Sequence, residues 1–132
     1  METNPDPVDA WLTLANQRLM AARVLIAQQL FDDAISRAYY SMFSAASAAL
    51  AALNIAPRSH AGLRNQFGQH FVQTGLLDPQ YAKMLARAFE ARQSSDYEIF
   101  NQATQLEAEA VISNAEQFVN TIKNRNYSAM SF

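Results

Sequence analysis

Residues 31–53 read FDDAISRAYYSMFSAASAALAAL, and this stretch decides the fold. Its carboxylates at Asp32 and Asp33 complement the N-terminus of a helix. Apolar side chains then recur at steps of three and four, the repeat of one helical face: Ile35, Tyr39, Met42, Ala46, Ala49 and Leu53. The many alanines allow neighbouring helices to approach closely. The stretch therefore predicts a long, tightly packed helix.

The same spacing appears on both sides of this stretch, between Pro, Gly and Asp residues that punctuate the chain. It predicts further helices at 7–29, at 60–74 (short), from 78 to between 94 and 101, and through 108–122. No segment shows the alternation of a strand. Four long amphipathic helices with short links predict an all-α fold, an antiparallel four-helix bundle with an additional short helix before the fourth.

Composition limits the organisation and the possible functions. The 132 residues suit one domain over 1–132, and the tail at 124–132, without a periodic apolar face, is expected to be loosely ordered. Half of the residues are hydrophobic and 17% are charged, which favours an oligomer. The absence of cysteine excludes disulfides, thiolate zinc sites and cysteine nucleophiles. With neither a signal segment nor a long apolar run, we expect a cytoplasmic protein that contacts no membrane.

Charge is distributed unevenly, although the formal net charge is only -2. Between Asp33 and Asp78 the chain has no carboxylate, yet it holds three arginines and both histidines there: Arg37, Arg58, Arg64, His60 and His70. A local positive field with titratable imidazoles suits an anionic ligand such as a phosphodiester. The sequence thus predicts that function lies in this stretch.

Four segments together resemble the small stand-alone HEPN domains of bacteria and archaea. They read SRAYYSMF at 36–43, PRSH at 57–60, FGQHFVQTG at 67–75 and RQSSDY at 92–97, and the likeness spans residues 8–125. The resemblance implies a helical bundle that pairs as a homodimer. Many members are ribonucleases that use neither metal nor cofactor. Many are toxins whose antitoxin is a minimal nucleotidyltransferase (MNT).

The family's catalytic signature is an arginine, usually followed by a polar residue, with a histidine after four to six further positions. Arg64, Asn65 and His70 fit it with five intervening residues. The resemblance therefore implies RNA cleavage in which His70 moves a proton, Arg64 clamps the phosphate and Asn65 orients either group. On a regular helix Arg64 and His70 would lie roughly 120° apart, so we expect two subunits to pool their motifs unless Gly68 distorts the helix.

Other residues of the basic stretch have both functional and structural interpretations. Arg37, Arg58 and His60 could bind RNA or a nucleotide, but His60 could equally follow a capping serine as a solvated neighbour. Tyr97 stands where a later copy of the signature would have histidine, and it is a weak candidate for the tyrosine that antitoxins of this family modify. The alternative function is a catalytically inactive nucleotide-binding module or an accessory subunit of a nucleotidyltransferase.

Overall fold

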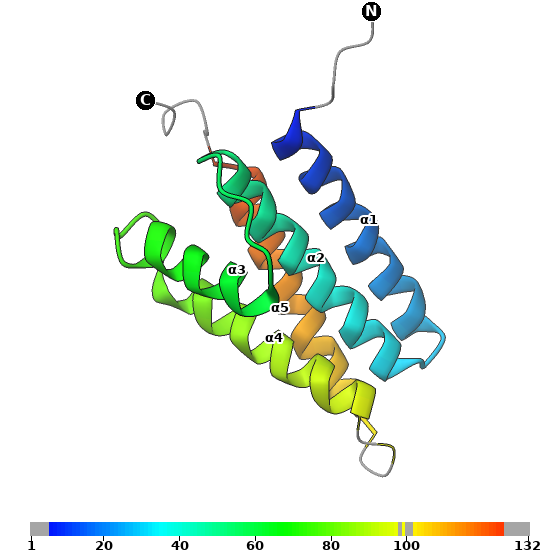
Figure 1. Cartoon of the computed structure of the whole chain (residues 1–132). Coiled ribbons are helices and arrows are strands. Elements are labelled where there is room, and N and C mark those ends of the chain that lie inside the picture. Colours follow the sequence, from blue (N-terminus) through cyan, green and yellow to red (C-terminus); the bar gives the residue numbers. More distant parts are fainter. Residues whose placement is uncertain (1–5, 98, 100–101, 126–132) are drawn as a thin grey trace, which may run out of the picture.

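The computed structural model describes residues 6–97, 99 and 102–125, and this part of the chain is helical without strands (Figure 1). Its elements are α1 (Pro7–Ala27), α2 (Phe31–Ala51), α3 (His60–Phe67), the π-helical turn η1 (Gly68–Val72), α4 (Pro79–Tyr97) and α5 (Gln105–Lys123). The predicted all-α class is confirmed, with four long helices and a short one. Most of the tail that we expected to be loose lies outside the described residues.

Helix starts follow the local chemistry of the sequence. The Asp6 carboxylate accepts a hydrogen bond from the Val8 N–H at 2.9 Å, just before Pro7 in the first turn of α1. The Ser59 hydroxyl accepts from the Gly62 N–H at 2.9 Å, so the predicted cap of the short helix is present. These side chains satisfy N–H groups that the helix itself leaves unpaired.

Helix α5 begins with a capping box. Thr104 accepts from the Glu107 N–H, and the Glu107 carboxylate accepts from the Thr104 N–H. Replacing Thr104 by alanine is expected to lower the free energy of unfolding by about 1 kcal/mol, because one terminal donor loses its partner. Urea unfolding checks this value. An unchanged urea midpoint for Thr104→Ala would show that the cap does not contribute to stability.

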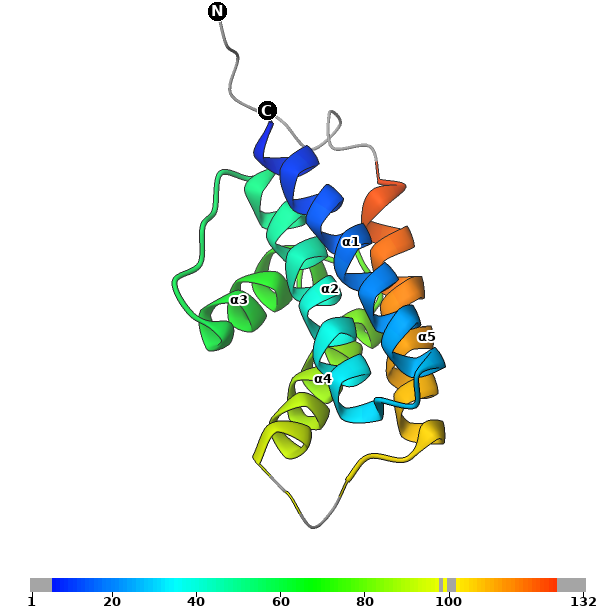
Figure 2. The ribbon, with the colours of Figure 1, turned by 90° about the vertical axis from the view of Figure 1, so that its right-hand side faces the viewer.

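Helix α2 lies in the middle of the molecule and contacts α1, α3, α4 and α5 (Figures 1 and 2). Its second half is almost entirely buried, and most of the buried side chains there are alanines or serines. The alanine-rich, closely packed helix that the sequence predicts is present. Three buried serines donate to carbonyl oxygens three or four residues earlier, so no hydroxyl is left unpaired among them: Ser41, Ser44 and Ser47. Small side chains and satisfied hydroxyls let the other helices pack closely around α2.

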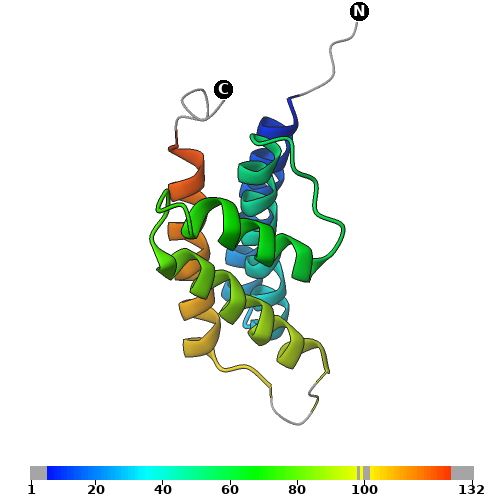
Figure 3. The ribbon, with the colours of Figure 1, turned by 60° about the vertical axis from the view of Figure 1, so that its left-hand side comes forward.

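The short helix changes character at Gly68. The α-helical hydrogen bonding of α3 gives way to the wider η1 turn, in which the Gln73 N–H donates to the Gly68 carbonyl at 2.9 Å. The segment ends at Gly75, whose φ of +78° favours glycine. The predicted extent, 60–74, is therefore nearly right, but its last turns are not α-helical. Figure 3 shows this segment lying alongside α4.

None of the helices in the described part of the chain is both long and apolar enough to span a membrane.

Candidate phosphate-binding site

His60, the first residue of α3, packs into a cluster of aromatic rings. Helix α2 contributes Tyr39, Tyr40 and Phe43, whose ring centroids lie 5.7, 6.1 and 5.0 Å from the imidazole. Helix α4 contributes Phe89 at 5.9 Å. The cluster therefore joins three helices, and the half-buried His60 ring has little freedom to turn.

The hydroxyl of Tyr39 fixes the orientation of the imidazole. It lies 2.5 Å from Nδ1 of His60, so Nε2 is the nitrogen left for a ligand. Burial raises the pKa of Tyr39 to about 12, although the positive charge of Arg64 opposes this shift. The phenol therefore keeps its proton across the neutral range.

The pKa of His60 is lowered from its usual value of 6.5. Removal from water is the largest cause, followed by the positive charges of Arg92 and Arg64. His60 is therefore neutral at pH 7, with a lone pair available to accept a proton.

Two arginines approach the same aromatic cluster. Cζ of Arg64, one helical turn after His60, lies 4.0 Å from the centre of the Phe89 ring. Cζ of Arg92, on α4, lies 5.3 Å from the centre of the Tyr40 ring. Both guanidinium groups thus rest on aromatic faces, a contact that stabilises a cation without neutralising it.

Each guanidinium keeps a nitrogen that is buried and lacks a hydrogen-bond partner within the described ranges: Nη1 of Arg64 and Nε of Arg92. Nε of Arg92 does lie 3.0 Å from Oδ2 of Asp96, an ion pair without hydrogen-bond geometry. Buried N–H groups of charged side chains are normally satisfied, so each exception calls for an explanation. A phosphate oxygen would supply the missing acceptors once a movement of the surrounding side chains gives it access to these nitrogens.

The other residues predicted for the site lie elsewhere. His70 belongs to η1, where its Nε2 lies 3.2 Å from Oε1 of Gln66, so Arg64 and His70 have different partners. Asn65, Arg58 and Arg37 are exposed. Tyr97 is the last residue of α4, and its side chain lies outside the described residues. A composite site that pools Arg64 and His70 across a dimer stays a prediction.

The roles of Tyr39 and Arg92 were not predicted from the sequence, and His60 was given only a secondary role. Tyr39 was assigned to the core, where the tyrosine is indeed fully buried, without a role for its hydroxyl. Arg92 was noted only as the first residue of the segment at 92–97 that carries part of the family resemblance. The available signal was the i,i+4 spacing of His60 and Arg64, which puts both side chains on one helical face.

The lowered pKa of His60 predicts a pH dependence of stability. The unfolded chain takes up a proton near pH 6.5 and the folded protein only at lower pH, so the free energy of unfolding should fall as pH drops from 7.5 to 5.5. A His60→Gln variant should lose less over this window. Urea midpoints at several pH values measure the difference, with His70→Gln as the matched control. Parallel curves for wild type and His60→Gln would refute the prediction.

As to metals, the side chains that the structure describes form no group of three or more His, Asp or Glu suited to hold an ion.

Comparisons with known proteins place the chain in a family. The model of the HEPN domain matches residues 8–125. The chain is 36% identical over 118 residues to "Putative toxin MJ0605" of Methanocaldococcus jannaschii, which covers 89% of this chain and 87% of the relative. It is 39% identical over 106 residues to "UPF0332 protein glr0978" of Gloeobacter violaceus, covering 80% and 84%. A "UPF0332 protein PH1297" of Pyrococcus horikoshii is 38% identical over 98 residues, covering 74% and 69%. The resemblance predicted from four short segments is confirmed, and the chain belongs to the HEPN domain family.

Proposed function

We propose that this protein is a toxin-like HEPN ribonuclease that cleaves RNA through the ribose 2′-hydroxyl. The observation that carries the proposal is the buried, unpartnered Nη1 of Arg64, one helical turn from a neutral imidazole. A relative that shares most of its length with the chain bears a toxin name, which supports the biological role. The family resemblance adds the restraining partner, an MNT-type nucleotidyltransferase antitoxin.

The chemistry follows from the positions of three side chains. Arg64 and Arg92 hold the phosphate and stabilise the charge that develops on its oxygens. Nε2 of His60 takes the proton of the 2′-hydroxyl as the bond from O2′ to phosphorus forms. The imidazolium then returns this proton to O5′ as the bond from phosphorus to O5′ breaks. For Nε2 to hold the lone pair, Nδ1 of His60 must carry the ring hydrogen and donate it to the Tyr39 oxygen, and the imidazolium keeps this same bond.

This assignment differs from the sequence prediction in one residue. The sequence pairs Arg64 with His70, whereas the geometry within one protomer favours His60 as the imidazole that shares a site with Arg64. Asn65, Arg58 and Arg37 are exposed and remain candidates for contacts with the RNA backbone. A homodimer would allow His70 of a second copy to approach, and sedimentation velocity of the purified chain tests for that dimer.

Expression and cleavage assays test the function together. Wild type is expected to arrest growth and to cut single-stranded RNA in the presence of EDTA, and co-expression of a cognate nucleotidyltransferase should relieve the arrest. A His60→Ala/Arg64→Ala double variant with wild-type circular dichroism should do neither. If both forms are harmless and leave RNA intact, the ribonuclease proposal is wrong.

A second function has its own structural support. The imidazole of His60 contacts four aromatic rings and its Nδ1 is already bonded, an arrangement equally suited to a rigid binding site. In that case the chain would be a catalytically inactive nucleotide-binding or accessory subunit of the nucleotidyltransferase. Binding of RNA by wild type without any cleavage would favour this alternative.

A further inference from the structure

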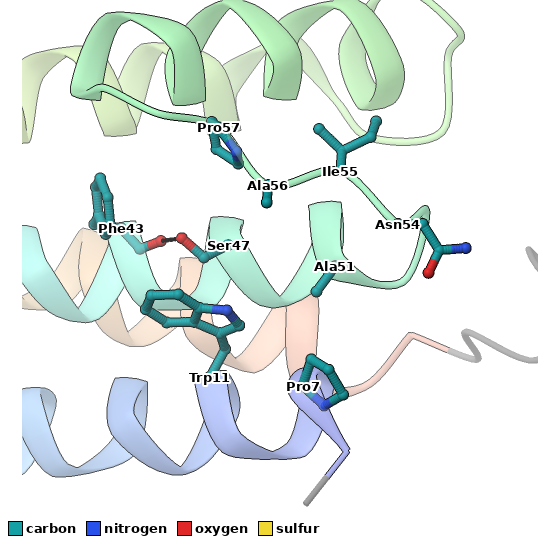
Figure 4. A pocket seen from close by; sticks show the side chains of 9 residues that line it. All are labelled: Pro7, Trp11, Phe43, Ser47, Ala51, Asn54, Ile55, Ala56 and Pro57. Atoms are coloured by element: carbon teal, nitrogen blue, oxygen red, sulfur yellow. Dashed lines mark hydrogen bonds between the residues drawn. The ribbon is translucent and has the colours of Figure 1, made fainter. Parts of the chain in front are cut away.

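A cavity of about 340 Å³ opens beside the aromatic cluster, between α1, α2 and the segment that leads to α3 (Figure 4). Trp11 from α1 and Phe43 from α2 form part of its wall, and Pro57 closes it from the side of the connecting segment. Ser47 and Asn54 are its polar members. The volume is near the lower end of the range for ligand pockets, which suits a small flat molecule.

The two aromatic walls offer faces on which a planar ligand can stack. The rings of Trp11 and Phe43 have centroids 6.4 Å apart and stand at 67° to each other. Trp11 is only half-buried, and Figure 4 shows its indole directed from α1 toward α2 and the connecting segment. A large aromatic side chain that borders a cavity, rather than filling it, is suited to cover a ligand.

Two polar side chains border the cavity. The Ser47 hydroxyl donates its hydrogen to the Phe43 carbonyl at 2.9 Å, so its oxygen can still accept a hydrogen bond from a ligand. The exposed amide of Asn54 can both donate and accept, and a φ of +60° holds this residue in a turn. With only these two polar groups, the cavity offers little to distinguish one base from another, as expected where stacking supplies most of the affinity.

Phe43 connects the cavity with the phosphate-binding cluster. It lines the cavity and also contacts His60, with centroids 5.0 Å apart. Pro57, on the opposite wall, precedes His60 by only three residues. An apolar cavity therefore adjoins a cationic site that holds two guanidinium groups, which is the pairing of surfaces that a nucleotide presents.

We propose that this cavity binds one nucleobase of the RNA, stacked on one of the two rings, Trp11 or Phe43, with its edge toward the other, while the adjoining phosphate lies at Arg64 and His60. The inference rests on the proposed function, since it deepens the description of the same site. Stacking accepts any base, so the cavity would position single-stranded RNA with modest sequence preference.

Trp11 is the only tryptophan of the chain, so its fluorescence reports on this cavity alone. Titration of the full chain with adenosine or uridine 5′-monophosphate in EDTA should change the emission and saturate. Ribose 5-phosphate and inorganic phosphate should leave the emission unchanged, because neither contains a base. If the nucleotides leave the Trp11 emission as unchanged as inorganic phosphate does, the base site is wrong.

A variant separates stacking from mere apolar filling. Phe43→Leu keeps an apolar side chain without a ring and should weaken nucleotide binding about tenfold, whereas Phe31→Leu, at the other end of α2, should bind as wild type does. Equal affinities for Phe43→Leu and wild type would overturn the proposal.

Two different outcomes separate an error in the base site from an error in the ribonuclease proposal. If nucleotides change the Trp11 fluorescence saturably but the protein leaves RNA uncut in the cleavage assay, the base site stands and the ribonuclease proposal is wrong. If the protein cleaves RNA, nucleotides do not change the Trp11 fluorescence and Phe43→Leu cleaves at the wild-type rate, the ribonuclease proposal stands and the base site is wrong.

Discussion

Replacing Arg64 by alanine is expected to lower the rate of RNA cleavage about 10²–10³-fold, the usual cost of losing one group that stabilises transition-state charge. The guanidinium rests 4.0 Å from the centre of the Phe89 ring with a buried N–H lacking a protein acceptor among the described residues. It is therefore held in place before the phosphate arrives. Single-turnover cleavage of a short labelled RNA in EDTA measures the change.

Two further variants separate charge from geometry. Arg64→Lys keeps the charge but lacks the planar fork, so its rate should lie between those of wild type and Arg64→Ala. Arg87→Ala removes an exposed arginine of α4 and should cleave at the wild-type rate. Equal losses for Arg64→Ala and Arg87→Ala would mean that only overall charge matters and that Arg64 has no special position.

Replacing Phe118 by alanine is expected to cost about 3–5 kcal/mol of unfolding free energy, the range for a large aromatic side chain in a core. Phe118 of α5 is fully buried. Its ring centroid lies 5.4 Å from that of Phe67 in α3 and 6.1 Å from that of Tyr81 in α4. Removing it leaves a cavity where three helices meet. Urea unfolding gives the difference.

The same helix provides the control for this loss. Leu106 is 77% exposed, so Leu106→Ala should change stability by less than about 0.5 kcal/mol. Phe118→Leu should lie between the two. If Phe118→Ala unfolds at the wild-type urea concentration, the helices do not meet around this ring.

The sequence predicts the fold well where one physical signal is strong. The three- and four-residue spacing through Ile35, Tyr39 and Met42 gives α2, and Pro7 and Asp78 are found at helix starts. The sequence allows a distortion at Gly68 but does not predict its π-helical form, because a single wider turn changes neither composition nor apolar spacing.

The site was harder to predict because it is assembled from three helices. Arg64 and the basic character of its surroundings were recognised from local sequence. Arg92 follows Arg64 by 28 positions, and only the packing of α3 against α4 brings both guanidinium groups to the same aromatic cluster. The role of the Tyr39 hydroxyl depends on a bond to His60, 21 residues away, which periodicity does not encode.

The most direct test compares the two histidines of the chain, which are its only ones. RNA cleavage in EDTA should be measured for wild type, His60→Ala and His70→Ala at matched circular dichroism. His60→Ala is expected to lose about 10²–10⁴-fold in rate, the range for a general acid–base group, while His70→Ala keeps most of it. Full activity of His60→Ala, with the loss in His70→Ala, would contradict the site built on His60 and Arg64.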